Sequence, residues 1–338
     1  MRTQYARPSS RRRFLGRVTL VGTAGLLGLY PKRAAAEPPP ETTRLRLAQT
    51  PVLCFAPQFV AEELLRLEGF TDVQYVKVAK GPYLALAAGE VDINTGMGQQ
   101  FILQIDAGDP LVILAGTHAG CLALFATEHI RSVKDLKGKT VAVPGLGTSH
   151  HLIVASMAAY VGLDPRRDIT FVTPPTAEAM QRLAEGKIDA MIGFRRERQE
   201  LHARQIGHVV VNMTTDRPWS QYFCCMLAGS ADFVRQHPVA TKRAVRALLK
   251  ANALCAQEPE RVAQTLVDKG VTPHVGYAVQ ALKELPFGTW REYDAEDTVR
   301  FYALRLHEAG MIKSTPQKII AQGTDWRFLN ALKKELKG

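Results

Sequence analysis

From residue 44 onwards, short apolar runs alternate with stretches in which apolar residues recur at helical spacing. The first strand is predicted at 45–48. A helix is predicted at 56–67, where Phe59, Val60 and Leu64 lie on one face. The same patterns predict further strands at 73–78, 91–94 and 111–115, with helices at 82–88 and 99–107. Alternating strands and helices predict an α/β fold, with mostly parallel sheets flanked by helices.

The alternation begins again near residue 139. Strands are predicted at 139–143, 169–172, 190–193 and 208–211, with helices at 148–161 and 176–185. An extended run at 219–227 precedes a helical tail predicted at 238–257, 259–268, 295–309 and 316–320. About 300 residues exceed what one core usually organises, so we expect two lobes. Residues 44–125 plus 222–338 are predicted to form lobe 1 and residues 126–221 lobe 2, with crossings near 123–129 and 219–226.

Residues 1–36 have the pattern of an export signal. A basic start is followed by a mildly apolar stretch at 18–30 and a small-residue site at 34–36. The run Ser-Arg-Arg-Arg-Phe-Leu at 10–15 resembles a twin-arginine signal. We expect a monomer exported to the periplasm, with the signal removed and a Pro-rich spacer at 37–43. The alternative is a cytosolic protein with a basic tail.

The charge of the chain belongs mostly to that segment. The formal net charge is +11, from 43 basic and 32 acidic residues, but residues 1–36 hold eight Lys and Arg and no acid. The remaining 35 basic residues against 32 acidic ones leave a net charge of +3. The high pI therefore gives no support for nucleic-acid binding.

The five cysteines are odd in number and lack the Cys-x-x-Cys spacing of metal sites. We expect free, mostly buried thiols. His150 and His151 are consecutive on a predicted helix, about 100° apart, and so are poorly placed to share one ion. We therefore expect neither a metal site nor a cofactor.

Three stretches carry a resemblance to a known family. Residues 132–143 read SVKDLKGKTVAV, and the phrase L-x-x-G-x-(V/I)-D occurs at both 86–92 and 183–189. These stretches resemble type II periplasmic solute-binding proteins of ABC importers, within the group that binds nitrate, sulfonate, taurine and thiamine-pyrimidine precursors. The resemblance implies a two-lobed Venus-flytrap fold. It also implies solute capture between the lobes and delivery to a permease driven by an ATPase.

Parallel sheets bind ligands where strands lead into helix N-termini, so the loops at those points are the candidate site. In the second lobe, Gly147 allows close approach, and Thr148 and Ser149 supply hydroxyl groups. Ordinary helix capping is the alternative. The first-lobe counterpart is a predicted turn that contains Thr95, Gly96 and Gln99, for which the alternative is a turn that needs glycine.

Four further residues are candidates to contact the solute. Phe55, in the apolar loop 50–57, is predicted to lie in a hydrophobic wall, although a buried core segment is the alternative. Arg195 is suited to bind a carboxylate or sulfonate through paired hydrogen bonds, and the alternative is that it belongs to a solvated charged face. Trp219 would stack on a planar solute or pack at the crossing. Thr117 is expected to face the cleft.

An enzyme is the main rival to a binding protein. Thiamine-pyrimidine synthases share the implied fold and carry an iron-linked motif with three consecutive cysteines. Here only Cys224 and Cys225 occur together, followed by Met226. No Ser-His-Asp order or carboxylate pair emerges from spacing, so no catalytic residue is assigned. A periplasmic ligand-sensing accessory protein is a third possibility. We predict a binding protein for a small sulfonate, carboxylate or heterocycle.

Overall fold

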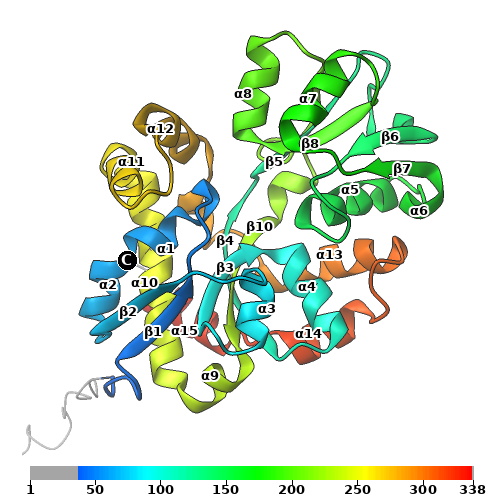
Figure 1. Cartoon of the computed structure of the whole chain (residues 1–338). Coiled ribbons are helices and arrows are strands. Elements are labelled where there is room, and N and C mark those ends of the chain that lie inside the picture. The colour runs from blue at the N-terminus through cyan, green and yellow to red at the C-terminus, as the bar shows by residue number, and fades with distance from the viewer. Residues whose placement is uncertain (1–36, 337–338) are drawn as a thin grey trace, which may run out of the picture. The chain divides into compact units, whose positions relative to one another are not determined.

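The computed structural model describes residues 37–336, so the predicted signal peptide lies outside the described residues. Its first sheet has five strands in the order β2-β1-β3-β10-β4 (Figure 1). Their bounds are β1 Arg44–Ala48, β2 Asp72–Val76, β3 Ile93–Met97, β4 Leu111–Ala119 and β10 Phe223–Ser230. β1 pairs in parallel with β2 and β3, whereas β10 runs antiparallel between β3 and β4.

The second sheet repeats this plan in the order β7-β6-β8-β5-β9. Its strands are β5 Leu122–Ala126, β6 Lys139–Ala142, β7 Ile169–Val172, β8 Ala190–Phe194 and β9 His208–Asn212. Here β5 is the antiparallel strand, between β8 and β9. Each lobe is therefore a mostly parallel sheet, and the predicted two-lobed α/β fold is confirmed.

The first crossing between the sheets is shorter than predicted. β4 ends at Ala119 in the first sheet and β5 begins at Leu122 in the second, so only Gly120 and Cys121 lie between them. The predicted lobe boundary after residue 125 is therefore wrong, because residues 122–126 pair with β8 and β9. β5 is a central strand in which every residue is buried, and the chain returns to the first sheet with β10.

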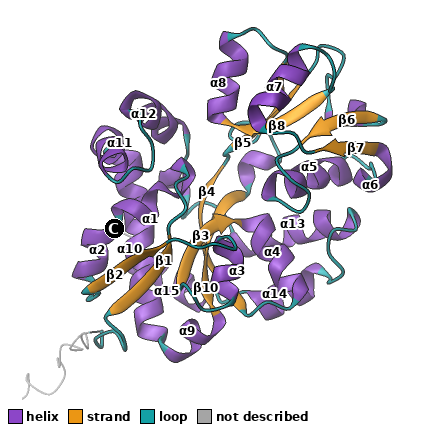
Figure 2. Cartoon of the chain, in the orientation of Figure 1, coloured by secondary structure: helices purple, strands orange, loops and turns teal. Residues whose placement is uncertain are grey.

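Helices cover both sheets (Figure 2). Around the first sheet lie α1 Ala56–Val60, α2 Glu62–Leu67, α3 Pro82–Ala87, α4 Gly98–Ala107, α9 Ala231–Gln236, α10 Pro238–Gln257, α11 Pro259–Asp268, α12 Val275–Glu284, α13 Ala295–Glu308, α14 Pro316–Gly323 and α15 Arg327–Glu335. The second sheet has α5 Ser149–Tyr160, α6 Pro165–Asp168, α7 Thr176–Ala184 and α8 Arg195–Ala203. Short 3₁₀ helices are η1 Leu53–Phe55, η2 Val133–Leu136, η3 Trp219–Gln221 and η4 Phe287–Thr289. Within the described residues, no helix is long and apolar enough to cross a bilayer.

Strand β5 shows how the cores of the two lobes are related. Side chains alternate between the two faces of a strand. Leu122 and Leu124 belong to the large core that also fills lobe 1. Ala123 and Phe125 belong to a smaller core that the second sheet shares with α7. One face of the second sheet thus continues the core of lobe 1, which limits how far the lobes can separate without exposing apolar surface.

Gly116 lies where β4 passes the buried ring of Phe223, and a Cβ there would meet three ring atoms at 2.2, 2.3 and 2.4 Å. We expect Gly116→Ala to lower the free energy of unfolding by about 1–3 kcal/mol, because a filled core has no room for a methyl group. The control is Gly276→Ala in α12, where nothing lies within 4 Å of the added methyl group. That change should stabilise the protein by up to about 1 kcal/mol. Chemical denaturation measures the free energy of unfolding of both variants. Equal changes in the two variants would contradict the packing argument.

Candidate functional site

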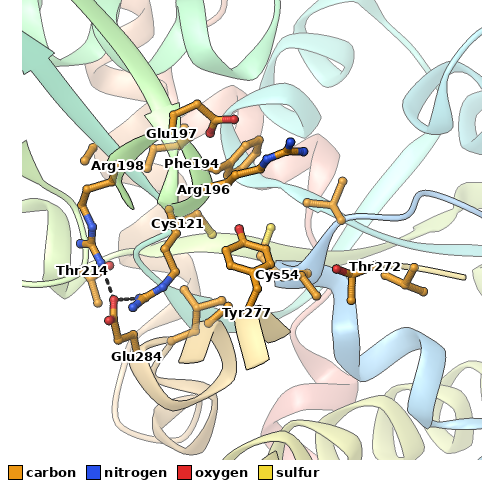
Figure 3. A pocket seen from close by; sticks show the side chains of 18 of the residues that line it. Cys54, Cys121, Phe194, Arg196, Glu197, Arg198, Thr214, Thr272, Tyr277 and Glu284 are labelled. Carbon is orange, nitrogen blue, oxygen red and sulfur yellow. Dashed lines mark hydrogen bonds and ion pairs between the residues drawn. The ribbon is translucent and has the colours of Figure 1, made fainter. Parts of the chain in front are cut away.

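A cavity of about 280 Å³ lies between the lobes (Figure 3). Lobe 1 contributes the segment around η1 and residues of the tail near α12, and lobe 2 contributes the start of α8 and residues after β9. The crossing itself provides Cys121, followed by the first residues of β5. The cavity is thus bounded by both lobes and by the segment that joins them.

The loop before α1 supplies the apolar wall. Pro51, Val52, Leu53 and Cys54 line the cavity, as a hydrophobic wall requires. Phe55, which is predicted to lie in this wall, is instead buried in the core at 4% exposure and is not among the residues that line the cavity. The predicted loop thus reaches the cavity, but through the residues before Phe55.

The charged residues of the cavity come mainly from the first turn of α8. Arg195 and Arg198 both form ion pairs with Glu284 of α12, so these pairs tie lobe 2 to lobe 1 (Figure 3). The amide of Gln199 donates to Gln280 at 2.6 Å beside them. Burial, with Arg198 nearby, lowers the pKa of Arg195 to about 10, which leaves its guanidinium charged at neutral pH. Its Nε is buried without a hydrogen-bond partner among the described residues.

Two more charged groups of α8 face the same space. Arg196 is exposed and lines the cavity, and no ion pair is formed by it within residues 37–336. Glu197 is half-buried, and burial raises its pKa. One of its carboxylate oxygens, Oε2, is buried with no hydrogen-bond partner in the described part of the chain. Of the predicted site residues, Arg195 is the one that the structure places at the cavity.

The predicted turn of the first lobe does not exist. Thr95 and Gly96 lie inside β3, paired with β10, and α4 begins directly at Gly98. Gly96 is needed for packing, since a Cβ there would meet Tyr83 at 2.6 Å and Phe101 at 2.7 Å. Gln99 is fully buried in α4. These three residues are parts of the sheet and helix core and do not line the cavity, so their contact with a solute stays a prediction.

Thr117, Trp219 and the second-lobe turn also have structural partners. Thr117 Oγ1 donates to the carbonyl of Cys225 at 2.8 Å, inside the first sheet. The buried ring of Trp219 packs edge-on against Tyr160 and Phe301, each with a centroid separation of 5.6 Å. None of the three residues Gly147, Thr148 and Ser149 lines the cavity.

Within that second-lobe turn, the hydroxyl groups serve the backbone and the facing lobe. Thr148 Oγ1 donates to the carbonyl of Gly145 at 2.7 Å. The backbone N–H of Gly147, at a φ of +76°, donates to His151 Nδ1 at 3.0 Å. The hydroxyl of Ser149 approaches Gln100 Oε1 of α4 at 3.5 Å, across the lobes. The turn therefore contributes to contact between the lobes.

Sequence reasoning missed a cluster of thiols. All five cysteines are free and four are buried, as expected. However, the Sγ atoms of Cys54, Cys121 and Cys225 all lie within 4.8 Å of one another. Hydrogen bonds from Cys121 and Cys225 hold the pKa of Cys54 well below its usual value, whereas burial raises the pKa of Cys121. No spacing signal reveals this cluster, because its members are separated by 67 or more positions in the sequence.

The sequence profile of the NMT1-like family matches residues 38–267. Over 109 residues, the chain is 29% identical to the bicarbonate-binding protein CmpA of Synechococcus elongatus; the match covers 32% of this chain and 24% of CmpA. The chain thus spans about a quarter of the curated relatives that it matches.

Two solved structures are similar in fold. The periplasmic nitrate-binding protein NrtA from Synechocystis PCC 6803 has a TM-score of 0.69 at 16% identity, over 89% of this chain and 90% of that one. A putative periplasmic sulfonate-binding protein SsuA from Methylobacillus flagellatus KT has a TM-score of 0.66 at 20% identity, over 87% and 94%. At these identities the likeness establishes the fold.

His150, at the start of α5, packs edge-on against Phe194 at 4.9 Å, and burial lowers its pKa to about 4. An unfolded histidine titrates near 6.5, so below that pH the unfolded chain binds the extra proton. Stability should therefore fall as the pH drops from about 6.5 towards 4, by about 1–2 kcal/mol at pH 5 from this residue.

His150→Gln should remove that part of the pH dependence in denaturation curves at pH 7 and pH 5. His202→Gln, at an exposed histidine of α8, is the control and should not change the pH dependence of stability. Parallel pH dependence in the wild type and the His150 variant would show that His150 is solvated.

Proposed function

The chain belongs to the NMT1-like family, and on this premise we propose that it is the substrate-binding component of an ABC importer. It would capture a small organic anion, a carboxylate or a sulfonate, between its two lobes. Its partners would be permease and ATPase subunits, and it would act in the periplasm. The observation that carries the proposal is the cavity bounded by both lobes and by their crossing.

The charges of the cavity favour an anion. Three arginines line it, Arg195, Arg196 and Arg198, against two carboxylates, Glu197 and Glu284. Glu284 is already paired with two of the arginines, which leaves Arg196 available to a ligand. A guanidinium binds a carboxylate or sulfonate through two parallel hydrogen bonds. The similar proteins are named as binding bicarbonate, nitrate or sulfonate, and all three of these solutes are anions.

The remaining lining suits a small organic body. Phe194, Leu122 and the apolar loop before α1 offer contact surface, and Tyr277 and Thr272 offer hydroxyl groups. A volume of about 280 Å³ is close to the lower limit of small-molecule sites. These features support a compact solute with one anionic group and an apolar part.

The mechanism is a shift between open and closed states. A solute that touches α8 on one side and the loop before α1 on the other binds the closed state better, and so increases its population. The ion pairs of Arg195 and Arg198 with Glu284 stabilise the same closed arrangement. Their partial exposure keeps this contribution small, so the solute would supply most of the difference. The permease would then recognise the closed form.

We expect Arg196→Ala to weaken binding of the solute by about 10- to 100-fold, because one charge-assisted contact is lost. Thermal-shift screening against carboxylates and sulfonates, followed by calorimetry, identifies the ligand and measures the change. The matched control is Arg167→Ala in α6, whose side chain is 87% exposed and does not line the cavity. Unchanged affinity in the Arg196 variant would place the anionic group elsewhere, and a screen without any anionic ligand would contradict the proposed solute class.

A binding protein and an enzyme differ in what happens to the ligand. We expect one solute molecule per chain, recovered chemically unchanged after prolonged incubation and denaturation of the protein. Mass spectrometry of the released solute checks this directly. Conversion of the solute at a rate proportional to protein concentration would favour the enzyme alternative, provided that Arg196→Ala slows it in parallel with binding.

A further inference from the structure

Three cysteines from segments that are distant in the sequence meet at the cavity, two of them in its lining. Cys54 comes from η1, Cys121 from the crossing and Cys225 from β10. Their sulfur atoms all lie within 4.8 Å of one another, and those of Cys121 and Cys225 are 3.5 Å apart. Cys54 and Cys121 line the cavity, so the cluster has access to what enters it (Figure 3).

The geometry matches a metal site with three sulfur ligands. The point equidistant from three atoms that are mutually within 4.8 Å lies at most about 2.8 Å from each, and zinc–sulfur bonds are about 2.3 Å long. Small side-chain rotations would close that gap. Thiolates prefer soft and borderline ions such as Cu(I) and Zn(II) over hard ions such as Mg²⁺ or Ca²⁺.

We propose that Cys54, Cys121 and Cys225 bind a thiophilic metal ion, and that this ion is Zn(II). The remaining coordination position of the ion would face the cavity. Three protein ligands and one open position are the arrangement in which zinc accepts a water or an exogenous ligand. An anionic ligand oxygen would be suited to that position. The site thereby adds a ligand-binding group that is separate from the arginines of α8.

The backbone holds Cys121 in an unusual conformation. Its φ is +114°, in a region that residues other than glycine rarely adopt, and it follows Gly120 at +82°. Such strain persists where the surrounding structure imposes it, and it is concentrated at functional sites. Here it occurs at the one half-buried member of the cluster, which lies between the two sheets.

A buried histidine contacts two of the three cysteines, one through its backbone carbonyl and one through its sulfur. His118 Nε2 lies 2.9 Å from the carbonyl oxygen of Cys54, and Nδ1 lies 2.9 Å from that of Ala119 and 3.9 Å from Cys121 Sγ. The ring packs edge-on against the buried Phe287 at 4.6 Å. His118 thus links η1 to the end of β4 and acts as a positioning residue, as outer partners of metal ligands do.

The test uses the full chain, reduced and freed of metal, without any organic solute. One equivalent of Zn(II) should bind in competition with a chromogenic chelator. Cd(II), as a spectroscopic substitute, should produce near-ultraviolet sulfur-to-metal absorption. Zn(II) should also protect Cys54 and Cys121 from alkylation, as mapped by mass spectrometry, and raise the melting temperature.

Single variants Cys54→Ser, Cys121→Ser and Cys225→Ser should each weaken Zn(II) binding about 100-fold or more, since loss of an outer partner alone costs 10- to 100-fold. Cys255→Ser, at a buried free cysteine of α10, is the matched control and should bind as the wild type does. Circular dichroism establishes that each variant is folded, and the wild-type titration stands even if one variant is not.

Several outcomes separate the alternatives. Cu(I) bound at the same three sulfurs in preference to Zn(II) would keep the site and change its ion. A reduced wild-type protein that fails to take up either ion, or that only forms a Cys121–Cys225 disulfide on exposure to air, would overturn the proposal. Because no solute is present, each result is independent of whether the chain transports an anion.

Discussion

The structure depends on a two-residue crossing. Gly120 and Cys121 carry the chain from the fourth strand of one sheet into a central strand of the other, and both residues have positive φ angles. Added bulk at Gly120 would collide with Thr214, which itself lines the cavity. A connection this short would limit any relative movement of the lobes to a rotation about this point. That constraint explains why the cavity forms beside the crossing.

Two kinds of contact join the lobes, apolar packing and ion pairs. One face of the second sheet shares the large core of lobe 1, through Leu122 and Leu124, and this contact is permanent at the crossing. A second contact between the lobes is formed by Glu284, which meets Arg195 and Arg198 through partly exposed ion pairs. Buried apolar surface is costly to separate, whereas exposed ion pairs contribute little. Separation of the lobes would thus cost more at the shared apolar core than at the ion pairs.

Periodicity predicted much of the fold, and the errors have physical causes. Helices α10 and α11 begin and end at the predicted residues, because proline at the start and a regular apolar face define them. The sequence predicts a connection near 123–129 instead of strand β5, since a fully buried strand shows no alternation. Thr95 and Gly96 were assigned to a turn because glycine permits turns, yet here glycine admits the rings of Tyr83 and Phe101. The thiol cluster needs the topology, which no local pattern contains.

The division of the site between the lobes has a consequence for how a ligand would be held. Cys54 and Cys225 belong to the first lobe and Cys121 to the crossing, so opening of the cavity leaves the three sulfurs together. The arginines of α8 belong to the second lobe and would move with it. A ligand would therefore meet the cysteine cluster first, in the open state, and would meet the arginines only on closure. Since the arginines then act in a space with less water, their attraction is strongest in the closed state, which is the condition for a ligand to drive the movement.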